Sequence, residues 1–317
     1  MPIDDRHYSL VAELLADGEI VPFLGAGANL CDRPEEARWE LGRFAPSGGE
    51  LAQTLAASSR YPDADLNLLR VSQYVDAILG EGRLYRYLHD VFDANYPPTS
   101  LHRLFARLPA VLRAKGRPQL LLLTTNYDDL LERAFAEAGE PFDVVWYEAK
   151  RGPLHGRFLH RPPGGEVVPI ERPNEYTALA LEERPVILKL HGAIDRSNVK
   201  GDSYVITEDS YIDYLVGGDV GAQIPFSLLE RMADSHFLFL GYSMHDWNLR
   251  VILNRIWGAQ QLDMKSWAVQ RTPADAGARE VEEALWRSRG DVDLLYAPLR
   301  DYVERLEREL DAAGPPA

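Results

Sequence analysis

Residues 119–129 read Gln-Leu-Leu-Leu-Leu-Thr-Thr-Asn-Tyr-Asp-Asp, an apolar run that stops at two hydroxyls, an amide and two carboxylates. This pattern is typical of a buried parallel strand, because such strands are covered on both faces and ligands bind beyond their carboxyl ends. The polar residues therefore predict a site at the end of this strand.

The same pattern occurs at three other places in the chain. Ile20–Leu24 runs into Gly25-Ala-Gly27, Val186–Leu190 into His191-Gly192, and Phe237–Leu240 into Gly241-Tyr-Ser243. Because the carboxyl ends of parallel strands meet at one edge of a sheet, we expect these residues to surround one site. Pro22 lies inside the first strand, which predicts an edge strand or a position where the missing N–H is harmless.

Apolar residues recur at three- and four-residue spacing between these strands, which predicts helices. The predicted helices cover 7–17, several stretches within 50–115, and 130–138, 208–216, 225–234, 246–257 and 299–310. Further strands are predicted at 203–207, 266–270 and 291–296, whereas 148–185 are predicted to leave the sheet. Alternating strands and helices predict an α/β fold, a parallel sheet with helices on both faces.

Composition limits the class of protein. Apolar residues make up 46% and charged residues 26% of the 317, which is ordinary for a soluble globular fold. The formal net charge of −15 disfavours direct nucleic-acid binding, which depends on Lys and Arg neutralising phosphates. The chain opens without a signal-peptide pattern and has no apolar run of about 18 residues, so we expect a cytoplasmic protein without a membrane span.

Cys31 is the only cysteine, so no internal disulfide can form and no zinc site built on several thiolates. We therefore expect no zinc and no other metal. A thiol beside a Gly-rich turn can be reactive if its pKa is lowered, but we interpret Cys31 as a small filler residue. The polar segment 31–49 is long for a loop, which is typical of a lid or binding segment, and Trp39 is a candidate gate.

The Gly-rich turn is a weak signal by itself. Gly25-Ala-Gly27 is the first half of a dinucleotide fingerprint, but Leu30 stands where its third Gly belongs. No Gly-Lys-Ser/Thr is present either, so the sequence indicates neither a standard dehydrogenase nor a P-loop nucleotidase.

Taken in order, the four strand ends resemble the motifs of the sirtuin family: Gly25-Ala-Gly27, Thr125-Asn126-Tyr127-Asp128, Leu190-His191-Gly192 and Gly241-Tyr-Ser243. Residues 239–249 look like the bacterial sirtuin-like branch associated with phage defence. The resemblance implies one sirtuin-like domain over 1–317 with a Rossmann-like NAD-binding core. Its expected parts are the core at 18–30, 117–147 and 186–300, an inserted helical module at 48–116, and a C-terminal helix at 299–312.

The resemblance also implies a role for each motif. The first motif, Gly25-Ala26-Gly27, is expected to cradle the phosphates of NAD. Asn126 is expected to hold the ribose or its attacking water, Asp128 to contact the nicotinamide amide, and His191 to act as base. Gly241 and Ser243 are expected to complete the cofactor site, with Ser243 on the adenosine side. Cleaving the glycosidic C–N bond develops positive charge on the ribose, which needs a neutral base and oriented polar groups. A histidine with a near-neutral pKa suits that role.

Departures from the family favour one reaction. Sirtuin deacylases carry Thr-Gln-Asn where this chain has Thr124-Thr-Asn126, and they carry a Cys₄ zinc module that one cysteine cannot build. The missing residues belong to the part of the deacylase site that binds the acyl-lysine peptide. Their absence favours water as the acceptor of the ADP-ribosyl group. We therefore expect an NAD glycohydrolase that releases ADP-ribose and nicotinamide, as an effector of anti-phage abortive infection, working as a homo-oligomer or with a HerA-type ATPase.

Two other functions stay open, an NAD-dependent lysine deacylase and a non-catalytic regulatory module that binds NAD or ADP-ribose. Each motif also has a structural alternative. Asn126 and Asp128 fit helix caps, His191 fits a buried, satisfied histidine, and Ser243 fits a turn. The convergence of all four motifs decides between these interpretations.

Overall fold

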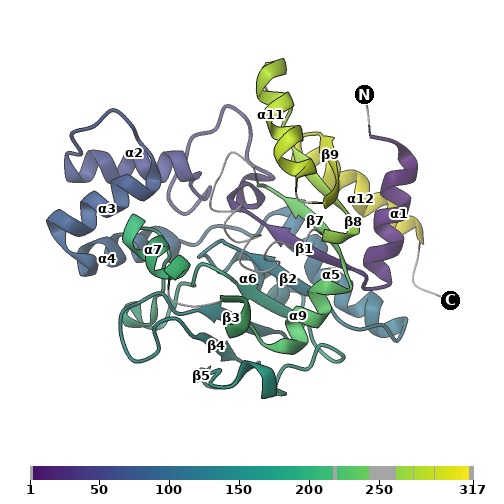
Figure 1. Ribbon diagram of the computed structural model, residues 1–317. Helices are drawn as coiled ribbons and strands as arrows, with labels where there is room; N and C mark the ends of the chain where they lie inside the picture. The colour runs from purple at the N-terminus through teal and green to yellow at the C-terminus, as the bar shows by residue number, and fades with distance from the viewer. Residues whose placement is uncertain (1–2, 217–219, 243–261, 274, 289, 314–317) are drawn as a thin grey trace.

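The computed structural model describes residues 3–216, 220–242, 262–273, 275–288 and 290–313 (Figure 1). Within these residues, nine strands form one sheet in the order β5-β4-β3-β6-β2-β1-β7-β8-β9. The strands are β1 Ile20–Leu24, β2 Leu121–Thr124, β3 Asp143–Tyr147, β4 Phe158–Arg161, β5 Val168–Pro169, β6 Val186–Lys189, β7 His236–Leu240, β8 Leu262–Gln270 and β9 Gly290–Tyr296. The run from β3 to β9 is parallel, and β4 and β5 add antiparallel pairs at one edge.

The helices have the following bounds: α1 Asp5–Ala16, α2 Gly48–Ser59, α3 Leu68–Leu79, α4 Glu81–Phe92, α5 Ser100–Ala114, α6 Leu130–Glu137, α7 Glu208–Val216, α8 Val220–Gln223, α9 Phe226–Ala233, α11 Ala276–Arg287 and α12 Leu299–Ala313. Short 3-10 helices span Ala26–Leu30, Pro173–Glu175 and Val199–Gly201. Every predicted helix that falls on described residues is present, with ends that differ by a few residues. The helix predicted at 246–257 lies outside the described residues.

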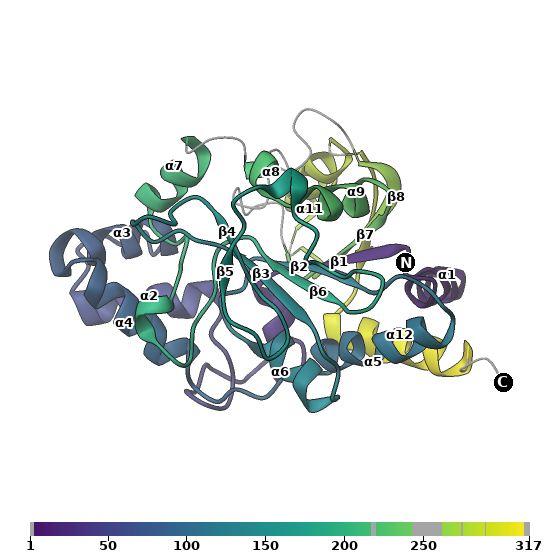
Figure 2. The ribbon, with the colours of Figure 1, turned by 90° about the horizontal axis from the view of Figure 1, so that it is seen from below.

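Two helical layers cover the sheet (Figure 2). One apolar core joins α1, α5, α6 and α12 to alternate residues of the central strands, such as Leu24 and Leu122. A second core joins α7, α9 and α11 to the residues between them, such as Phe23 and Leu123. This alternation is what a strand covered on both faces requires, so the predicted α/β fold is confirmed.

The helices α2, α3 and α4 form a separate cluster beside the sheet (Figure 1). Their apolar faces pack together and against Ile194, Tyr204 and Ile206 from the segment after β6. A capping box between Ser47 and Glu50 starts α2, because each side chain bonds the other residue's main-chain N–H. The fourth helix of this stretch, α5, packs on the sheet with α1, α6 and α12 instead.

Two sequence predictions about strands are wrong, and the strand β3 was not predicted. Residues 203–207 form no strand; they are extended beside the end of β6, where the N–H groups of Ser203 and Val205 donate to Ala193 and His191. Residues 148–185 return to the sheet as β4 and β5 instead of leaving it. For Pro22 the second of the two predicted alternatives holds: the residue lies in a central strand, and its missing N–H is harmless because the register of β1 with β2 begins only at Phe23.

Candidate active site

A cavity of about 160 Å³ lies beyond the carboxyl ends of β1, β2 and β6. Four residues that the sequence predicted for the site line it together: Ala26, Asn126, Asp128 and His191. The opposite wall comes from residues 46–48 and from α2, α3 and α4, through side chains such as Leu51, Leu68 and Phe92. Segments far apart in the chain therefore meet at one place, as the strand ends predicted. Ser243 lies outside the described residues.

His191 is 3% exposed, and its two ring nitrogens have different surroundings. Nδ1 lies 3.1 Å from the hydroxyl of Tyr211 on α7. Nε2 is buried and has no hydrogen-bond partner among the described residues. A buried polar atom without a partner is uncommon, so Nε2 is available to bind a ligand in the cavity.

The pKa of His191 lies below the near-neutral value that suits a catalytic base. Burial lowers the pKa of His191 from 6.5 to about 3, since the charged imidazolium loses its hydration there. The ring is therefore a neutral imidazole at physiological pH. A neutral ring can accept a hydrogen bond on one nitrogen while it donates from the other.

Asn126 is oriented by bonds to both of its amide hydrogens. Its Nδ2 donates to the carbonyl of Gly25 at 3.1 Å and to Oδ1 of Asn29 at 3.2 Å. Its main-chain N–H donates to the hydroxyl of Thr124 at 3.0 Å. Because Nδ2 makes both side-chain bonds, Oδ1 is the atom of Asn126 that can accept from a ribose hydroxyl or a water.

Asp128 combines the predicted site position with a structural role. Its Oδ1 accepts from the N–H of Leu130, the first residue of α6, at 3.1 Å. Its Oδ2 accepts from Nδ2 of Asn29 at 2.6 Å. Asn29 thus bridges Asn126 and Asp128, and sequence reasoning missed it. The available signal was a polar side chain two residues after Gly27.

The glycines of the first motif have a packing role. A Cβ on Gly25 would lie 2.6 Å from the carbonyl oxygen of Gly241, and Gly241 adopts a left-handed φ of 75° directly against Ala28. The N–H groups of Gly25 and Gly27 donate to Leu240 and Gly241. These glycines therefore let the ends of β1 and β7 touch, while Ala26 between them lines the cavity.

A buried ion pair supports the loop that carries Asn126 and Asp128. Lys189, the last residue of β6, lies 2.7 Å from Oε1 of Glu132 on α6. The same ammonium donates to the main-chain carbonyl of Asp128. Lys189 therefore ties the end of β6, two residues before His191, to the loop after β2.

The long segment 31–49 is fastened at its end by one carboxylate. Glu50 accepts from the guanidinium of Arg33 at 2.5 Å and from the N–H groups of Trp39 and Ser47, each at 2.9 Å. The indole of Trp39 donates to the hydroxyl of Tyr96 at 3.1 Å. These bonds hold residues 46–48 against the cavity, so the segment is an ordered wall in this conformation.

Cys31 is buried, which supports the interpretation as a filler residue. Burial raises the pKa of its thiol from 9.0 to about 12. We expect iodoacetamide at pH 8 to leave Cys31 unmodified in the folded protein and to alkylate it fully in denaturant. Intact-mass spectrometry measures both states, and rapid labelling of the folded protein would contradict the burial.

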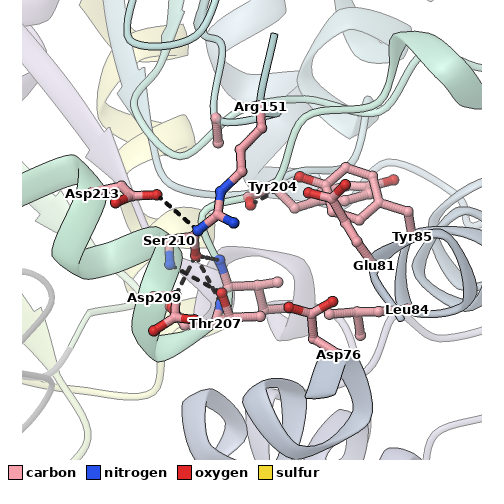
Figure 3. A pocket seen from close by; sticks show the side chains of 12 residues that line it. Asp76, Glu81, Leu84, Tyr85, Arg151, Tyr204, Thr207, Asp209, Ser210 and Asp213 are labelled. Carbon is pink, nitrogen blue, oxygen red and sulfur yellow. Dashed lines mark hydrogen bonds and ion pairs between the residues drawn. The ribbon is translucent and has the colours of Figure 1, made fainter. Parts of the chain in front are cut away.

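A second cavity, of about 180 Å³, lies between the α2–α4 cluster and α7 (Figure 3). Acidic side chains dominate it: Asp76 and Glu81 from the cluster, and Asp209 and Asp213 from α7. Arg151 reaches in and lies 3.5 Å from Asp213. None of the residues predicted for catalysis lines this cavity, so the candidate active site is the first one.

The described residues contain neither a candidate metal cluster nor a candidate membrane span. No three His, Cys, Asp or Glu side chains in the described ranges are grouped so that they could hold a metal ion. No helix of the same ranges is both long and apolar enough to cross a bilayer.

The parallel sheet, the Gly-rich turn after its first strand and the cavity at its carboxyl edge define an α/β protein of the Rossmann-like class. A family model for the SIR2-like domain matches residues 120–291. The chain belongs to the SIR2-like domain family, as the four strand-end motifs indicated.

Curated relatives support this assignment. The chain is 26% identical over 247 residues to Defense-associated sirtuin 2 of Bacillus subtilis. The aligned region makes up 77% of this chain and 20% of that protein. It is 27% identical over 195 residues to NAD(+) hydrolase ThsA of Acinetobacter baumannii, covering 61% of this chain and 32% of that protein. It is 26% identical over 184 residues to NAD(+) hydrolase ThsA of Bacillus cereus, and the aligned region makes up 58% of this chain and 30% of that protein. The chain thus spans about a fifth to a third of the length of these relatives.

Proposed function

We propose that this chain is an NAD glycohydrolase, which transfers the ADP-ribosyl group of NAD to water and releases nicotinamide. The observation that carries the proposal is that Asn126 lines the same cavity as His191, whose Nε2 has no hydrogen-bond partner among the described residues. The names of two relatives as NAD(+) hydrolases support the same reaction.

In this proposal each group has a role that its contacts allow. His191 accepts a hydrogen bond from a ribose hydroxyl through Nε2, and Asn126 orients the ribose or the attacking water through Oδ1. Both are neutral, so they stabilise the positive charge that develops on the ribose through dipoles that are already oriented. Asp128, bound to Asn29, supplies a negative charge at the same cavity and contacts the nicotinamide amide.

The name of the Bacillus subtilis relative supports a place in defence. We propose that cleavage of cytoplasmic NAD by this chain serves abortive infection by phage. The active form is a homo-oligomer or a complex with an activating partner such as a HerA-type ATPase. Gly25, Gly27, Gly241 and Ser243 complete the NAD site in this proposal.

The direct test is to incubate the purified chain with NAD and to separate the products by liquid chromatography. We expect equal amounts of nicotinamide and ADP-ribose, with no requirement for an acyl-lysine peptide. Nicotinamide release that needs such a peptide would identify a deacylase instead. NAD binding without any release, in every oligomeric state, would identify a regulatory binding module.

A further inference from the structure

The hydrogen bond between His191 and Tyr211 has two forms with opposite consequences for the cavity. A neutral imidazole carries one N–H, so either Nδ1–H donates to the Tyr211 hydroxyl or that hydroxyl donates to a bare Nδ1. In the first form the other ring nitrogen, Nε2, is an acceptor, and in the second it is a donor. The 3.1 Å distance between Nδ1 and the hydroxyl fits both forms.

The burial of Nε2 decides between them. Nε2 has no hydrogen-bond partner among the described residues, so it is either an unpaired donor or an unpaired acceptor in the free protein. Buried N–H groups without a partner are rarer than under-satisfied acceptors. The first form, with the proton on Nδ1, is therefore favoured before any ligand binds.

Tyr211 is well placed to hold this form. It is 3% exposed, and its ring meets the imidazole edge-on at 5.2 Å between centroids. The first turn of its helix α7 is fixed by Thr207 and Ser210, whose side chains bond each other's main-chain N–H groups at 3.0 and 2.8 Å. The hydroxyl is therefore delivered by a capped helix and not by a loose loop.

We propose that Tyr211 is a positioning residue that accepts a hydrogen bond from Nδ1–H of His191 and so presents a bare Nε2 to the substrate. This inference rests on the proposed NAD glycohydrolase function for its catalytic consequence. The tautomer itself does not depend on turnover, so the two can fail separately.

The first experiment is ¹⁵N NMR of the full chain labelled at histidine, because protonated and bare ring nitrogens have well-separated shifts. The signals of His191 are identified by their loss in a His191→Gln variant. We expect the wild-type protein to carry the proton on Nδ1, and Tyr211→Phe to move it to Nε2. A wild-type proton on Nε2, or an unchanged tautomer in Tyr211→Phe, would overturn the inference.

The matched control is Tyr214→Phe. The ring of Tyr214 also meets His191 edge-on, at 5.7 Å between centroids, and lies on the same helix. We expect this variant to keep the wild-type tautomer, because it keeps the bond between Tyr211 and His191. A tautomer change in both variants would mean that general packing controls the ring, which also overturns the inference.

Kinetics provide the second readout. We expect Tyr211→Phe to lower kcat about tenfold with KM changed less than about twofold, since one hydrogen bond to the acting group is lost. A wild-type kcat in Tyr211→Phe would overturn the positioning role even with the expected spectrum. Failure of the proposed function is distinct: the wild-type protein would release no nicotinamide, while the spectrum would still report on Tyr211.

Discussion

Replacement of Lys189 by Met is expected to lower the free energy of unfolding by about 3 kcal/mol, the usual effect of removing one partner of a buried ion pair. The side chains of Lys189 and Glu132 are only 1% and 10% exposed, and their charged atoms lie 2.7 Å apart. The variant leaves a buried carboxylate unpaired and also frees the carbonyl of Asp128. Urea unfolding followed by circular dichroism measures the loss.

The loss should depend on pH with a defined sign. Burial raises the pKa of Glu132 above its ordinary 4.5, and Lys189 opposes that rise, so removing Lys189 raises the pKa further. The protonated carboxyl is neutral, so its burial penalty is absent below pH 4.5 and grows as the pH rises through the raised pKa. We therefore expect a smaller destabilisation at about pH 5 than at about pH 8.

Two further variants separate this explanation from a general loss of a lysine. The double variant Lys189→Met with Glu132→Leu should recover much of the stability, since it removes both charges from the interior. Lys265→Met breaks a surface pair with Asp293, 2.9 Å apart with side chains 47% and 51% exposed. It should change stability by about 0.5 kcal/mol or less. A double variant less stable than the single one would refute the burial argument.

The strands β1, β2, β6 and β7 could be predicted because each is a self-contained apolar run, whereas β3 was not predicted. Ile20–Leu24 has the predicted bounds, and the strand predicted from Phe237 begins one residue earlier, at His236. Local pattern failed where pairing depends on distant residues. The strand β4 is antiparallel to β3, and nothing in the polar sequence of 148–185 indicates that pairing.

The site could be predicted only as far as its strand ends. Asn126, Asp128 and His191 meet because parallel strands share an edge, which is a property of the fold class. The roles of Asn29, Tyr211 and Lys189 were not predicted from the sequence, because they depend on contacts between residues far apart in the chain. Asn29 contacts Asp128 99 positions away, and Lys189 contacts Glu132 57 positions away. The low pKa of His191 was not predicted either, because it follows from the burial of the ring in the folded protein.

Replacement of His191 by Ala is expected to reduce the rate of nicotinamide release by about 10²-fold or more, in line with the loss of a positioned acid–base group. The change removes the buried Nε2, which has no hydrogen-bond partner among the described residues, from a side chain that lines the cavity. The folded protein should persist, because His191 has no charged partner among the described residues and its neighbours Tyr211 and Tyr214 both belong to a larger apolar core. Nicotinamide release at saturating NAD measures the effect, and equal turnover would remove His191 from the mechanism.

The matched control is His236→Ala, at the first residue of β7 and therefore at the opposite edge of the sheet from the cavity. It should retain wild-type turnover.

The pH dependence of the rate provides a second check. Because burial lowers the pKa of His191 to about 3, its neutral form is fully present above its ordinary pKa of 6.5 and is lost only as the pH falls through about 3. The wild-type rate should therefore show no loss from imidazole protonation between about pH 8 and pH 5. A fall in rate near the ordinary histidine pKa of 6.5 that disappears in His191→Ala would show that the ring is solvated and not buried.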